Sequence, residues 1–136
     1  MQRLREECVF YLDENLCNCK PIQEVFEHAE IKYERHLAHF PSGTPDPDWL
    51  SFVGQRGWIV ITKDKGQRYN PLEKTELQTY RIKQFAFHSG NLSGPEMAKI
   101  LRDNLRKIFN LIEKQPPPFI ATLTKSGVAA KALVSK

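Results

Sequence analysis

The chain has 136 residues, of which 40% are hydrophobic and 26% charged, and its net charge at pH 7 is +4. This length suits one domain with a core that needs no disulfide or metal to fold. No apolar run approaches the roughly 20 residues of a membrane helix, and the opening MQRLREEC is polar, so we expect a cytoplasmic protein without a signal peptide. The modest positive charge permits a polyanionic partner without requiring one.

Strands and helices are predicted to alternate along the chain. Short apolar runs bounded by polar turns predict strands at 9–12, 31–36, 58–64, around 85–87 and at 119–124. Apolar residues that recur every three or four positions predict helices at 18–29, 46–57, 71–80 and 93–114. The first strand, helix and strand form a crossover that implies parallel strands. We therefore expect a single α/β domain over 1–136 with a mostly parallel sheet, in which 124–136 form either a hairpin strand or a flexible tail.

Two of the helices carry recognisable start signals. Asp46 followed by Pro47 predicts an N-cap and a first helical residue, and Asp48 falls in the first turn. Ser93 with Glu96 three residues later predicts a capping box. Capping and the helix dipole are by themselves a sufficient explanation for Asp46 and Asp48.

Acidic residues follow two strands that read as buried. WIVITKD runs into Asp64, and VFYLDEN runs into Asp13 and Glu14. Because ligands bind outside the carboxyl ends of parallel strands, these acids are candidates to converge with Asp46 and Asp48 on one edge of the sheet. The remaining helix acids, among them Glu76, are expected on solvated helix exteriors.

A cluster of carboxylates without cysteine or histidine ligands suits a hard cation such as Mg²⁺ or Mn²⁺. An ion of this kind activates water and stabilises the leaving oxygen in phosphodiester hydrolysis. Lys63, Lys65 and Arg68 flank Asp64 and could hold phosphates, although a solvated loop explains them equally well. The four histidines have no partnered nucleophile in the sequence, and Trp49 and Trp58 are most simply core residues.

Five segments in order resemble the PIN-like domains grouped with VapC-type toxins. They are YLDENL at 11–16, FPSGTPDPDWL at 40–50, GWIVITKD at 57–64, RYNPLE at 68–73 and PFIA at 118–121. The resemblance implies a PIN-like fold and a Mg²⁺- or Mn²⁺-dependent endoribonuclease site. It assigns Asp13, Asp46 and Asp64 as catalytic metal ligands and Glu14, Asp48 and Glu73 as secondary acids. It also assigns Arg68 to phosphate contact.

One departure from the family pattern bears on activity. PIN nucleases usually carry a further acid shortly after the aspartate that matches Asp64, and here Lys65 and Gly66 stand in that neighbourhood. Glu73 or Asp48 would then be the fourth ligand, or the site would be weak.

Three functions follow as hypotheses. The first is an RNA-cleaving toxin held inactive by an antitoxin protein, with a homodimer implied by the resemblance and no membrane association. The second is a catalytically weak or inactive PIN-like module that binds RNA or a protein. A metal-dependent phosphatase or DNase built on the same acids is the third, since the ion chemistry does not select the ester.

Overall fold

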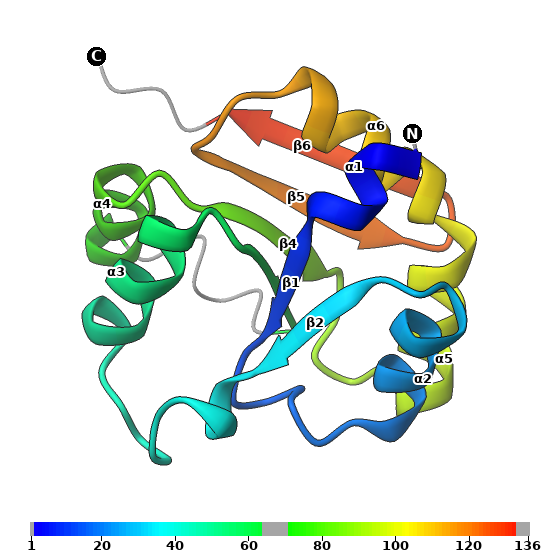
Figure 1. Ribbon diagram of the computed structural model, residues 1–136, viewed down its shortest axis with the longest axis horizontal. Helices are drawn as coiled ribbons and strands as arrows, with labels where there is room; N and C mark the ends of the chain where they lie inside the picture. Colours follow the sequence, from blue (N-terminus) through cyan, green and yellow to red (C-terminus); the bar gives the residue numbers. More distant parts are fainter. Residues whose placement is uncertain (1, 64–70, 133–136) are drawn as a thin grey trace.

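A computed structural model describes the backbone of residues 2–63 and 71–132, and the side chains of residues 5–63 and 75–130. Six strands form one sheet in the order β2-β1-β3-β4-β5-β6, with helices on both of its faces (Figure 1). The pairings from β2 to β5 are parallel, and β6 is antiparallel to β5. This is the mostly parallel α/β fold that the sequence predicts. No helix in the described ranges is long and apolar enough to span a membrane.

The elements agree with the predicted alternation, with additions at both ends. In chain order they are α1 (Gln2–Glu7), β1 (Val9–Leu12), α2 (Lys20–His28), β2 (Lys32–Arg35), the 3-10 helix η1 (His36–Ala38), α3 (Asp46–Arg56), β3 (Ile59–Thr62), α4 (Pro71–Thr79), β4 (Lys83–Phe87), α5 (Gly94–Asp103), α6 (Leu105–Lys114), β5 (Phe119–Thr124) and β6 (Gly127–Ala132). The sequence analysis did not anticipate α1 or η1. Of the segment 124–136, Gly127–Ala132 form the hairpin strand β6, and 133–136 lie outside the described residues.

Successive side chains of β1 and β3 enter two different cores. On β1, Phe10 and Leu12 join the core under α2, α5 and α6, whereas Tyr11 joins the core under α3 and α4. All four residues of β3 are buried, with Ile59 and Ile61 on the first side and Val60 on the second. This alternation is the two-residue period of a strand that is covered on both faces.

The helix predicted over 93–114 is wrong in one respect, because it is two helices that meet at Asn104. The buried Asn104 side chain donates from Nδ2 to the Ile100 carbonyl at 2.8 Å and to the Thr124 carbonyl at 3.0 Å. The second bond ties the helix junction to the end of β5, a contact that only the folded chain supplies. The predicted capping box of Ser93 and Glu96 is present.

The start of α3 also differs from the prediction. Pro45 occupies the N-cap position, and Asp46 is the first helical residue rather than the cap. Its Oδ1 accepts a hydrogen bond from the Trp49 indole nitrogen at 3.1 Å, so the indole replaces a backbone amide as the donor. The helix ends at Gly57, whose φ of 69° is the left-handed conformation that favours glycine.

The strand order reverses at β1, because the chain adds β2 on one side of this strand and β3 on the other. In open α/β sheets, ligands bind outside the carboxyl ends of the strands at such a switch point. Asp13 follows the last residue of β1, and Thr62 is the last residue of β3. The junction of Asp13 and Thr62 is therefore where this fold would be expected to bind a ligand.

We predict that Gly54→Ala destabilises the protein by about 1–3 kcal/mol, because a Cβ on Gly54 would overpack α3 against the chain after α4. The added carbon would collide with the Tyr80 carbonyl oxygen and lie 3.0 Å from the Tyr80 Cβ. Urea unfolding followed by circular dichroism measures the effect. Gly90→Ala is the matched control, since its added carbon meets no described atom nearer than 4.0 Å. Equal midpoints for the two variants would contradict the packing described here.

Candidate active site

Asp13 is a buried acid at the switch point, with 5% of its surface exposed. Its Oδ2 accepts a hydrogen bond from the Thr62 hydroxyl, and its Oδ1 accepts one from the Leu16 amide at 3.2 Å. The Asp13 carbonyl accepts from the Leu16 and Cys17 amides at 3.0 and 2.8 Å, which closes the turn after β1. The carboxylate is thus held in one orientation between β1 and β3.

Glu14 anchors the loop that leads to α3. Its Oε2 accepts a hydrogen bond from the Ser42 hydroxyl, and its Oε1 accepts one from the Gly43 amide at 3.1 Å. These two bonds are the main reason that the pKa of Glu14 lies below its usual value. Glu14 was a secondary candidate for metal binding, and its contacts favour a structural role in fixing the 40–45 loop.

His36 lies beside Glu14, and only 1% of its surface is exposed. Its Nδ1 is hydrogen-bonded to the Tyr11 hydroxyl, and its Nε2 lies 3.9 Å from the Glu14 Oε1. Burial raises the pKa of Tyr11, so its hydroxyl stays protonated. The buried Nε2 of His36 has no hydrogen-bond partner among the described residues. Burial also lowers the pKa of His36, against the opposing effect of the charges of Glu14 and Asp46.

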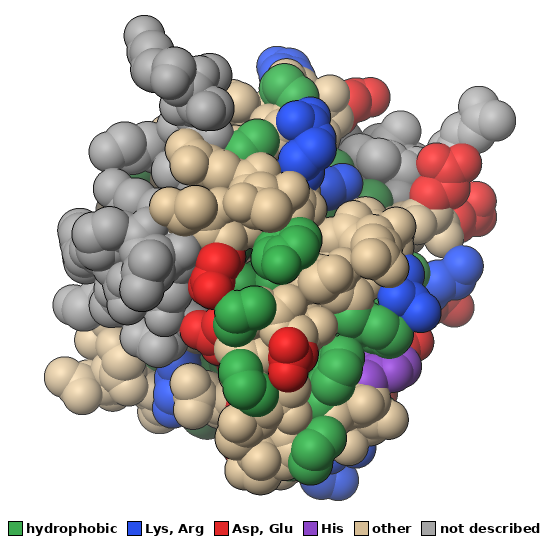
Figure 2. Space-filling view, turned by 90° about the vertical axis from the view of Figure 1, so that its left-hand side faces the viewer, with side chains coloured by type: hydrophobic (Ala, Val, Ile, Leu, Met, Phe, Trp, Pro, Cys, Tyr) green, Lys and Arg blue, Asp and Glu red, His purple; other side chains and the backbone are tan. Residues whose placement is uncertain are grey.

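The negative charge of Asp46, at the start of α3, acts on Glu76, which belongs to α4. Burial raises the pKa of Glu76, and the charge of Asp46 raises it further. Glu76 is half-buried where α4 packs against α3, so its carboxylate is less solvated than the helix pattern led us to expect. Figure 2 looks onto this side of the molecule and shows acidic side chains among apolar ones. No local signal in the sequence distinguishes Glu76 from the other helix acids.

Several predicted site residues are not tested by these contacts. Asp64, Lys65 and Arg68 lie outside the described residues, and Glu73 falls in the first turn of α4 without a described side chain. Lys63 follows β3 at the edge that carries Asp13, and its side chain is half-buried. Asp48 is exposed in the first turn of α3, where the helix dipole accounts for it. Among the described residues, no three His, Cys, Asp or Glu side chains form a group that could hold a metal ion.

A groove of about 750 Å³ runs between α2 and α5. It lies over the other face of the sheet, with a largely apolar lining that includes Val25, Ala29, Ala98 and Leu105. The candidate acids Asp13, Asp46 and Glu76 do not line it. We therefore place the candidate chemistry at the switch point, because the orientation of a buried carboxylate is a stronger indication than the size of a groove.

Comparison with known proteins identifies the family. A family model described as a PIN like domain matches residues 8–89, from the residue before β1 to just beyond β4. The match covers more than half of the chain, and the protein belongs to the PIN-like domain family. No curated protein and no solved structure matches the chain.

We predict that His36 makes the stability of the protein depend on pH. Its pKa is lowered from 6.5 in the folded state, so protons bind more tightly to the unfolded chain. The stabilisation due to the neutral imidazole is present above pH 6.5 and is lost as the pH falls from there through the folded pKa. The difference in unfolding free energy between wild type and His36→Gln should therefore shrink from pH 7.5 to pH 5.5. His28→Gln, at an exposed position, is the matched control, and a difference for His36→Gln that is constant with pH would contradict the assignment.

Proposed function

We propose that the protein is a Mg²⁺- or Mn²⁺-dependent ribonuclease of the VapC type, the toxin of a toxin–antitoxin pair, acting in the cytoplasm. The observation that carries the proposal is Asp13, a buried carboxylate held in a fixed orientation at the switch point of a parallel sheet. Membership of the family supports it, since PIN-like domains are commonly nucleases. The net charge of +4 suits a polyanionic substrate.

The proposed metal ligands are Asp13, Asp46 and Asp64. Asp13 and Asp46 offer hard carboxylate oxygens, which suit Mg²⁺ or Mn²⁺ better than softer metals. One oxygen of Asp46 is oriented by the Trp49 indole, as those of Asp13 are by Thr62 and Leu16. Asp64 enters on the sequence alone, where it stands two residues after Thr62.

The chain's own residues would contribute orientation and phosphate contact. When bound, the ion would polarise the phosphoryl oxygens and lower the pKa of a bound water. The hydrogen bonds to Asp13 fix its carboxylate beforehand, so little reorganisation accompanies the reaction. Lys63, at the same edge, would contact a substrate phosphate.

We predict that Asp13→Asn, Asp46→Asn and Asp64→Asn each lower the rate of RNA cleavage at least about a hundredfold, because each removes a charged metal ligand. Cleavage of end-labelled single-stranded RNA with Mn²⁺ or Mg²⁺ measures the rate, and EDTA should abolish it. Asp103→Asn is the matched control, since Asp103 is exposed on α5 and paired with Lys99 at 2.7 Å. Wild-type rates in all three Asn variants would overturn the proposal.

The second candidate is a PIN-like module that binds RNA or a protein without cleaving RNA. Lys65 and Gly66, at the place of the family's further acid, favour it, and so does the engagement of both Glu14 oxygens by the 40–45 loop. The same assay separates the two candidates. A wild-type protein that binds RNA in EDTA and leaves it intact with Mn²⁺ would support the module.

A further inference from the structure

An aromatic surface cluster lies beside β2, the edge strand of the sheet. Its members are the half-buried rings of Phe40, Phe52 and Trp58 and the more exposed side chains of His39 and Arg56. Phe52 meets Phe40 and Trp58 edge to face, with ring centres 5.1 and 5.6 Å apart. His39 packs on Phe52 and Trp58 at 5.2 and 5.5 Å. Its members come from the chain after β2, from α3 and from the residue before β3.

Arg56 gives this cluster a flat, charged surface. Its guanidinium carbon lies 3.5 Å from the centre of the Phe52 ring and 5.8 Å from that of Trp58. Its Nη1 donates to the Phe52 carbonyl oxygen at 3.1 Å, which holds the guanidinium over the ring. Within the described part of the chain, no carboxylate lies at ion-pair distance from Arg56, and the neighbouring His39 is paired with Glu34 at 2.8 Å. The Arg56 guanidinium therefore keeps its positive charge without a carboxylate partner in the described part of the chain, and Glu34 lies on the far side of His39.

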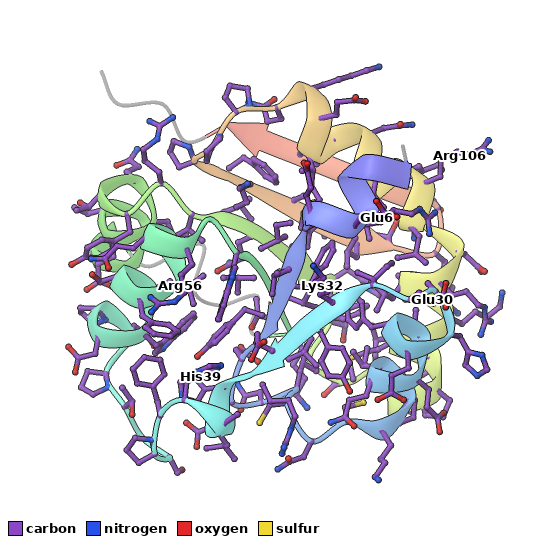
Figure 3. The ribbon with its side chains drawn as sticks, in the orientation of Figure 1. Glu6, Glu30, Lys32, His39, Arg56 and Arg106 are labelled. Carbon is purple, nitrogen blue, oxygen red and sulfur yellow. The ribbon has the colours of Figure 1, made fainter. Side chains whose placement is uncertain are left out.

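The cluster is continuous with the candidate active site. Tyr11, two residues before Asp13, stacks against Trp58 at 6.1 Å and against Trp49 at 5.4 Å. The Trp49 indole in turn donates to Asp46. Asp46 and Arg56 are the first and last residues of α3, about 15 Å apart at 1.5 Å per residue. Figure 3 shows Arg56 and His39 on the same side of the molecule, with Arg106 on the opposite side.

We propose that the cluster of Phe40, Phe52, Trp58, His39 and Arg56 binds unpaired bases of single-stranded RNA a few nucleotides from the scissile phosphate. Bases stack on aromatic rings and on guanidinium planes, and positive charge beside the rings attracts the phosphates. The bases of a duplex are already stacked on one another and cannot use such a surface. The inference rests on the proposed ribonuclease function and names the surface that would hold the bases beside the scissile phosphate.

The test measures binding of a fluorescein-labelled 12-nucleotide single-stranded RNA by anisotropy in EDTA, so that cleavage cannot interfere. Arg56→Ala should weaken binding at least about fivefold, since removal of one stacking partner for a base has effects of this size or larger. Arg56→Lys keeps the charge and loses the plane, so it should bind nearly as weakly as Arg56→Ala. Arg106→Ala removes the same charge from α6 on the far side and is the matched control. Duplex RNA of the same sequence should bind equally well to the Arg56 variants and to Arg106→Ala. The affinity for single-stranded DNA of the same sequence shows whether the sugar contributes to binding.

Cleavage of the small diester bis(4-nitrophenyl) phosphate with Mn²⁺ separates this inference from the proposed function. Arg56→Ala should leave that rate unchanged, whereas Asp13→Asn should abolish it. Asp13→Asn could lose diester cleavage while wild type, Arg56→Ala and Arg56→Lys bind RNA equally. That result would overturn the base-binding surface alone, and a protein partner would then be the candidate occupant of the cluster. Unchanged diester cleavage in Asp13→Asn would overturn the proposed function instead. Circular dichroism of each variant excludes unfolding as the cause of lost binding.

Discussion

The hydrogen bond from Thr62 to Asp13 is the interaction on which the site depends. A carboxylate that is only 5% exposed is costly to keep charged unless it is hydrogen-bonded, and Thr62 and Leu16 supply the donors. Because Thr62 ends β3 and Asp13 follows β1, this bond joins the two strands between which the strand order reverses. The same contact thus links the architecture of the sheet to the orientation of its most buried acid. Charge-assisted bonds of this kind are shorter and stronger than neutral ones, so they suit a position that must not move.

A second set of contacts holds α3 in relation to β1. Glu14 binds the 40–45 loop through Ser42 and Gly43, and the buried His36 is hydrogen-bonded to Tyr11. Tyr11 stacks on Trp49, which orients Asp46. Polar and aromatic contacts therefore connect His36 to Asp46 through Tyr11 and Trp49. The arrangement explains why the FPSGTPD segment, which has no regular structure over its first residues, is nevertheless held in place.

Local patterns in the sequence were sufficient for most of the fold. Alternating and helical apolar periods predicted each of β1 to β5 and the helices from α2 to α4, and the Ser93 and Glu96 capping box needed only its own four-residue spacing. The break at Asn104 could not be predicted in this way, because the carbonyl of Thr124 that accepts its side chain lies 20 residues further along the chain. The burial of His36 and the raised pKa of Glu76 likewise depend on how α3 and α4 pack. For the site, the sequence predicted the position of Asp13 at the carboxyl end of β1, whereas the hydrogen bonds of Glu14 with Ser42 and Gly43 span 28 and 29 residues and leave no local signal.

The central claim is that the edge between β1 and β3 is a metal-dependent catalytic site, and Mn²⁺ binding tests it most directly. Electron paramagnetic resonance of free Mn²⁺ during titration with protein gives the affinity for wild type, Asp13→Asn and Thr62→Val. Our account predicts saturable binding by wild type, no binding at the same concentrations by Asp13→Asn, and weakened binding by Thr62→Val, in which the Asp13 carboxylate loses its orienting donor. Equal Mn²⁺ affinity in all three proteins would contradict it.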